Sequence, residues 1–82
     1  MAAGAGGEEI RYVRRLVEAL QLLRGAQAVE VRGEWAMEED ARAVVADFVQ
    51  VFELDVVITE LPDGFKVEKA RGQPDRTIRL DF

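Results

Sequence analysis

Two amphipathic helical patterns, separated by a short strand pattern, most constrain the fold open to this chain of 82 residues. The first runs from about Glu8 to Arg24 and the second from about Met37 to Phe52. Apolar residues recur in both at spacings of three and four, which places them on one face of an α-helix. The predicted buried stripes are Ile10, Val13, Leu16, Val17, Leu20 and Leu23, then Ala41, Val44, Val45, Phe48, Val51 and Phe52. Each helix must therefore pack against another layer.

Four strands are predicted, at 28–32, 56–60, 65–69 and 76–82. The first, third and fourth alternate apolar and polar residues, and the second is a run rich in β-branched residues. The turn sequence at 61–64, Leu-Pro-Asp-Gly, separates the second strand from the third. A helix between two strands commonly joins neighbouring parallel strands in a right-handed crossover, which is the role expected of the second helix. The predicted fold class is α/β: a two-layer sandwich, with two helices on one face of a small mixed sheet in the order helix-strand-helix-strand-strand-strand.

The C-terminal segment from Asp55 to Phe82 is predicted to form a hairpin. Two β-rich runs, 56–59 and 77–80, would be its strands and would flank a polar arm at residues 61–76. Residues 1–60 carry six Lys and Arg against twelve Asp and Glu, a balance of −6, whereas the remaining residues carry five against four, a balance of +1. The local sign of the charge decides what a surface attracts. The arm is therefore the best place for an anion, through Lys66, Lys69, Arg71 and Arg76.

The composition removes several classes of function. The chain has no cysteine and no histidine, so it lacks thiolate metal ligands and the commonest general base. Serine is absent too, and Thr59 and Thr77 fall within predicted strands. The carboxylates at 38–40 are consecutive, so on a helix they point to different sides and do not converge on a metal. We therefore predict that the protein is not an enzyme and uses no cofactor and no metal.

Two stretches carry a family resemblance. Leu22-Leu23-Arg24-Gly25 ends the first helix at a glycine, and Val29-Glu30-Val31-Arg32-Gly33 is a strand that closes on Arg-Gly. With the order of the later elements, these stretches resemble the Alba superfamily and, more broadly, the fold of the C-terminal domain of bacterial translation initiation factor three. The resemblance covers roughly residues 9–82, expected to be a single Alba-like domain after a flexible lead-in at residues 1–8.

The resemblance implies a module that binds DNA or RNA weakly through phosphate contacts, as a homodimer or a heterodimer with a related protein. The residues expected to make these contacts are Lys66, Lys69, Arg71, Arg76 and Arg32. An Alba chain begins with a strand and a basic loop, where this chain has Gly4 to Glu9. Alba proteins usually carry basic residues before the second helix, where this chain has Glu34 and the acidic run 38–40. Of the family's three contact regions, only the arm keeps basic residues.

Each of these features also has a purely structural interpretation. Charges on the arm can solvate a hairpin and protect its edge from aggregation. Arg32 and Gly33 can simply end a strand, while Trp35, Met37 and Tyr12 can pack in a core or dimer rather than stack on bases.

The net charge of −5 supports an alternative function on the same scaffold. In this alternative the chain is an acidic protein–protein interaction subunit that binds a basic partner rather than nucleic acid. The sequence has neither a signal-peptide pattern nor an apolar run of membrane-spanning length. We therefore expect a soluble cytoplasmic protein without membrane contact.

Overall fold

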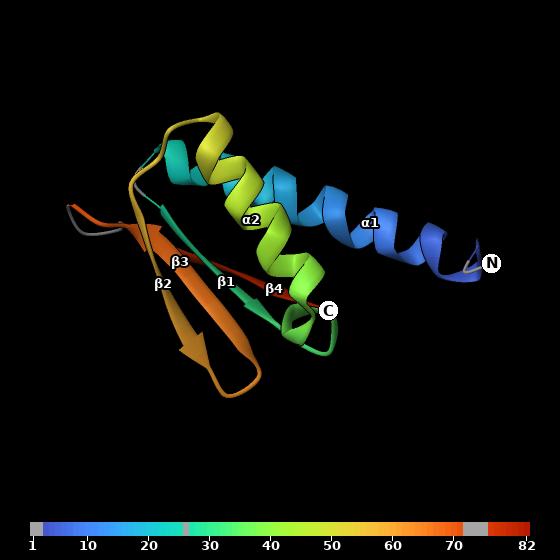
Figure 1. Ribbon diagram of the computed structural model, residues 1–82. Helices are drawn as coiled ribbons and strands as arrows, with labels where there is room; N and C mark the ends of the chain where they lie inside the picture. Colours follow the sequence, from blue (N-terminus) through green and yellow to red (C-terminus); the bar gives the residue numbers. More distant parts are fainter. Residues whose placement is uncertain (1–2, 26, 72–75) are drawn as a thin grey trace.

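The structure is a computed structural model that describes residues 3–25, 27–71 and 76–82. Its helical elements are α1 (Ala3–Leu20), η1 (Gln21–Arg24), η2 (Trp35–Met37) and α2 (Glu39–Val51). Its strands are β1 (Gln27–Arg32), β2 (Val56–Leu61), β3 (Gly64–Lys69) and β4 (Arg76–Asp81). Both α-helices lie on one face of a four-stranded mixed sheet (Figure 1). The predicted two-layer α/β sandwich is therefore confirmed.

The order of strands in the sheet corrects two predictions. The order is β2-β3-β1-β4, in which β3 is antiparallel to both β2 and β1, and β4 is parallel to β1. The runs 56–59 and 77–80 therefore lie at opposite edges of the sheet and are not strands of one hairpin. The strands before and after α2, β1 and β2, run in the same direction, but they are not neighbours because β3 lies between them. The predicted arm is largely β3 itself, and its residues 72–75 lie outside the described residues.

The central place of β3 follows from its side chains. Phe65 and Val67 are fully buried, and they stand opposite Val31 and Val29 of β1. Burial of two such side chains stabilises the fold most where a helix layer covers the strand and other strands flank it on both sides. The charged strand β4 takes an edge instead, with Arg79 paired to its near neighbour Asp81.

The start of the first helix also differs from the prediction. Helix α1 begins at Ala3, so residues 3–8 are helical rather than part of a lead-in, while residues 1–2 lie outside the described residues. The predicted end at Gly25 is confirmed, since the Gly25 N–H donates to the carbonyl oxygen of Leu22 over 3.0 Å.

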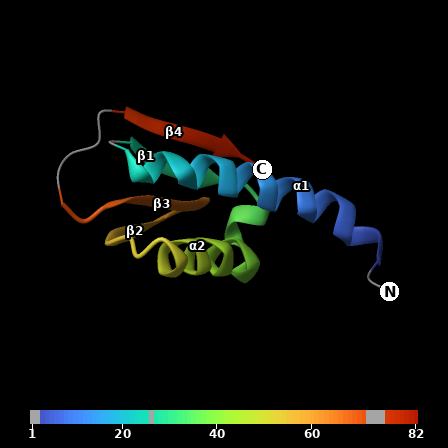
Figure 2. The same cartoon turned by 90° about the horizontal axis from the view of Figure 1, so that it is seen from above.

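The core lies between the helix layer and the sheet. In Figure 2, α1 lies on the side of β1 and β4, and α2 lies on the side of β2 and β3. Trp35 is buried, as its structural interpretation predicts, with its ring centroid 5.6 Å from that of Tyr12 and 5.1 Å from that of Phe82. The largest fully buried side chains are Phe65, Leu16, Leu20, Leu23, Val29, Val31, Val45 and Val67.

The close approach of β1 and β3 makes Gly64 a sensitive position. A Cβ atom at Gly64 would stand 1.8 Å from the carbonyl oxygen of Val31, and backbone there can yield only by separating the strands. We expect Gly64→Ala to lower the free energy of unfolding by about 1–3 kcal/mol in urea denaturation. Gly7→Ala is the control, because no atom lies within 4 Å of the added Cβ and alanine favours the helix by about 0.5–1 kcal/mol. Equal denaturation midpoints for the two variants would contradict this account.

Candidate protein-interaction surface

The predicted nucleic-acid contact Lys66 lies on the face of the sheet away from the helices. Side chains alternate along a strand, so Lys66 points away from the helix layer that buries Phe65 and Val67. It stands opposite Glu30 in β1 and Thr59 in β2. Opposite charges thus face each other across the two strands, although the Glu30 carboxylate binds Arg32.

The guanidinium of Arg32 lies on the same face and makes two contacts within the protein. Its Nε donates to Glu30 Oε1 over 2.5 Å, and an Nη donates to the carboxylate of Asp63 in the β2–β3 turn. Bidentate use of a guanidinium is what phosphate binding requires. Here the guanidinium donors of Arg32 bind Glu30 and Asp63, and so connect β1 to the β2–β3 turn.

The remaining predicted contacts, Lys69, Arg71 and Arg76, lie elsewhere. Lys69 ends β3, and its Nζ donates to the carbonyl oxygen of Arg24 over 3.4 Å, at the C-terminal end of η1. Arg71 follows shortly after, whereas Arg76 begins β4, with β1 between it and β3. The structure thus places Lys69 and Arg71 together, with Arg76 on the far side of β1 from them and Lys66 and Arg32 on the opposite face of the sheet.

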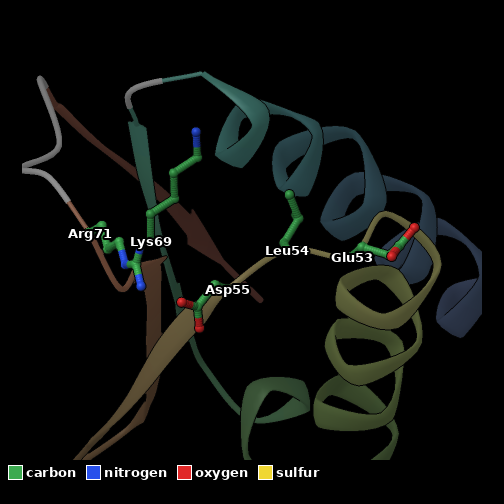
Figure 3. A pocket seen from close by; sticks show the side chains of 5 residues that line it. All are labelled: Glu53, Leu54, Asp55, Lys69 and Arg71. Carbon is green, nitrogen blue, oxygen red and sulfur yellow. The ribbon is translucent and has the colours of Figure 1, made fainter.

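Lys69 and Arg71 share a pocket of about 350 Å³ with Glu53, Leu54 and Asp55 (Figure 3). Figure 3 shows the Arg71 guanidinium turned toward Asp55, while the amino group of Lys69 points toward the end of η1. Two carboxylates therefore line the pocket beside the two cations. This balance makes the pocket a poor site for a highly charged anion such as a phosphate chain.

Carboxylates gather at the opposite end of the molecule. Helices α1 and α2 run in the same direction, so their N-terminal ends lie at one end of the helix layer (Figures 1 and 2). The pKa of Glu9 is raised there, first by a hydrogen bond with Asp40, then by the charge of Asp40, by burial and by the charge of Glu38. The Tyr12 hydroxyl, one turn after Glu8 in α1, donates a hydrogen bond to Glu8. This bond, and to a lesser degree the charge of Glu34, raise the pKa of Tyr12. We call Glu8, Glu9, Glu34, Glu38 and Asp40 the acidic end.

An apolar groove separates α1 from α2. It has a volume of about 300 Å³, and its lining is Val13, Val17, Val44, Asp47, Phe48, Val51 and Phe52. Val51 is 72% exposed, and Ile10, which is 60% exposed, continues the stripe of Val13 and Val17 toward the acidic end. At the other end, the Arg24 guanidinium lies 5.0 Å from the ring centroid of Phe52. The groove therefore leads from carboxylates at one end to a cation at the other.

This groove corrects the prediction that both helical stripes are buried throughout. Ile10, Val51 and Phe52 are exposed, because each stripe is wider than the surface that the sheet can cover. The width of each apolar stripe can be read from the sequence, and a helix that contacts one layer needs a stripe of only about 100°. That excess is the signal by which sequence reasoning could have found the groove.

The described residues hold no group of three or more Asp and Glu placed to bind a metal ion. None of the described helices is both long enough and apolar enough to cross a bilayer. No protein-family model, curated protein or solved structure matches the chain. The relationship to the Alba superfamily accordingly remains a prediction.

The contact between Glu9 and Asp40 predicts a pH dependence. Because the folded-state pKa of Glu9 lies above its ordinary value of 4.5, its contribution to stability is fully present below that value and is lost as the pH rises through the folded pKa. Glu9→Gln keeps a donor for Asp40 and removes the like charge. We expect its melting temperature to exceed that of the wild type at pH 7, with a difference that shrinks as the pH falls below about 4.5.

Glu18→Gln is the matched control, since it makes the same chemical change at an exposed position of the same helix. Thermal denaturation followed by circular dichroism from pH 3.5 to pH 8 measures both variants, a range that brackets the ordinary carboxyl pKa of about 4.3. If the two variants show the same pH dependence, the two carboxylates do not interact.

Proposed function

We propose that this chain is a non-enzymatic protein-interaction subunit that binds a basic partner protein rather than nucleic acid. The observation that carries the proposal is the exposed apolar groove between α1 and α2, which opens onto the acidic end. Apolar side chains that remain exposed beside a rim of one charge are typical of a docking surface. The partner surface that fits has apolar residues followed by Lys or Arg.

The shape of the groove favours an amphipathic helix as the part of the partner that binds. Two helices with a groove between them accept a third through side chains at spacings of three, four and seven. An antiparallel orientation would place the C-terminal turn of the partner helix over the acidic end, because α1 and α2 both begin there. Lys and Arg are favourable in the last turn of a helix, so dipole and charge select the same orientation.

The energetics fit a moderate, charge-steered affinity. Val51 and Ile10 are each more than half exposed, so covering either would contribute on the order of 1 kcal/mol. Charges at the acidic end would mainly accelerate the encounter with a cationic partner. Added salt would screen these charges and slow the encounter. Nucleic acid offers no comparable fit, since the five predicted basic residues do not form one continuous phosphate-binding track.

The test uses a synthetic amphipathic helical peptide with an apolar stripe and three lysines in its last turn. We expect the protein to bind it in fluorescence anisotropy, with an affinity that falls as salt rises. Val51→Glu should weaken binding about tenfold, because it places a charge in the groove without disturbing a buried residue. Thr77→Glu, at an exposed position on β4, is the charge-matched control and should bind as the wild type does.

A gel shift with duplex DNA and duplex RNA at low salt measures the competing function. We expect no shift at concentrations where the peptide is bound. A shift that Lys66→Glu abolishes, together with no peptide binding, would reject the proposal in favour of nucleic-acid binding.

A further inference from the structure

Strand β2 forms one edge of the sheet, so every second residue directs its backbone N–H and C=O groups away from β3. The Ala70 N–H donates to the carbonyl oxygen of Asp55 over 2.9 Å, which places that residue pair among the hydrogen-bonded pairs of the β2–β3 ladder. Hydrogen-bonded and non-hydrogen-bonded pairs alternate in an antiparallel ladder. Val56, Ile58 and Glu60 therefore direct their N–H and C=O groups outward, away from β3.

The two edges of the sheet differ in their protection. Edge strands usually carry lysine, proline or other charges that discourage pairing with another chain. The edge strand β4 carries Arg76 and the Arg79–Asp81 ion pair. The edge strand β2 reads Val-Val-Ile-Thr-Glu-Leu, and its single charge, Glu60, is held by Arg42 of α2.

The exposed side chains of β2 strengthen this contrast. Val57 is 48% exposed on the open face, and Ile58 is 42% exposed on the helix face. The strand therefore presents β-branched apolar groups on both faces, together with a row of backbone groups that no other strand among the described residues pairs with. These are the properties of a strand that pairs with another strand.

We propose that β2 pairs antiparallel with β2 of a second copy of this chain, about a twofold axis at Ile58. The two sheets then become one continuous sheet. In this register Ile58 faces Ile58 of the second copy, Val57 faces Thr59, and Val56 faces Glu60. An isologous contact of this kind uses one surface twice, and it closes without leading to a filament.

The side chains of β2 suit pairing with a second copy of the same strand. Antiparallel pairing about Ile58 sets the outward backbone groups of Val56, Ile58 and Glu60 against those of Glu60, Ile58 and Val56 in the second copy. No charge faces a like charge, since Glu60 stands opposite Val56. The pairs Ile58–Ile58 and Val57–Thr59 are β-branched cross-strand pairs, which stabilise a sheet.

This surface is distinct from the groove between α1 and α2, so the dimer does not depend on the proposed function. Dimerisation would leave both grooves open and would present two of them on one assembly. A partner with two helices could then bind with an avidity beyond that of a single groove.

Single-cysteine variants test the register directly, because the chain has no cysteine of its own. In the proposed dimer the two Ile58 Cα atoms form a hydrogen-bonded pair about 5.5 Å apart, within the range that a disulfide can bridge. Val57→Cys is the matched control: Val57 is similarly exposed, but its two copies lie diagonally, more than about 7 Å apart. Under mild oxidation we expect Ile58→Cys to form the disulfide dimer at least about fivefold faster.

Sedimentation equilibrium supplies a second, independent measurement. We expect the wild type to dimerise with rising concentration, Ile58→Lys to remain monomeric and Thr77→Lys, on the opposite edge, to behave as the wild type. Faster crosslinking through Val57→Cys, equal rates for the two cysteine variants, or a wild type that stays monomeric at about 1 mM, the weak end of specific association, would each overturn the proposal. If Ile58→Lys proves unfolded by circular dichroism, the two cysteine variants still decide the question.

Discussion

The buried contact between β1 and β3 determines the rest of the molecule. Phe65 opposite Val31 and Val67 opposite Val29 place two large apolar pairs under the helix layer. Once these two strands are central, β2 and β4 can only take the edges. Arg42 of α2 secures this arrangement at its border, since its guanidinium lies 4.9 Å from the Phe65 ring centroid and also binds Glu60 of β2. The contrast between the two edges of the sheet follows from this one choice of neighbours.

The sequence was sufficient for the elements and the fold class but not for the topology. Periodicities of 3.6 and 2 depend only on the local chain, so the two helices and four strands could be located to within a few residues. Strand partners depend on the whole molecule. The β-rich composition of 56–59 and 77–80 is compatible with a hairpin, and only the deeper burial of Phe65 and Val67 shows that β3 must separate the two runs.

The candidate site shows the same limit. Lys66, Lys69 and Arg71 are neighbours in sequence, yet the alternation of β3 sends Lys66 to one face and Lys69 toward η1. Conversely, Glu9 and Asp40 are far apart in sequence, yet they lie close enough in the fold for Asp40 to raise the pKa of Glu9. Local charge balance therefore could not reveal the acidic end, because a surface is made by elements that meet rather than by residues that follow one another.

The common direction of α1 and α2 has a consequence for the electric field of the protein. Antiparallel helices cancel their dipoles, whereas parallel helices add them, which concentrates positive potential at the end where both begin. The carboxylates at that end offset this potential, so they serve the helices as well as any partner. Removing them to weaken binding would leave the summed dipole exposed and would turn the same surface toward anions. The potential at this end is thus the sum of two opposing fields, and substitutions of its carboxylates would make it more positive.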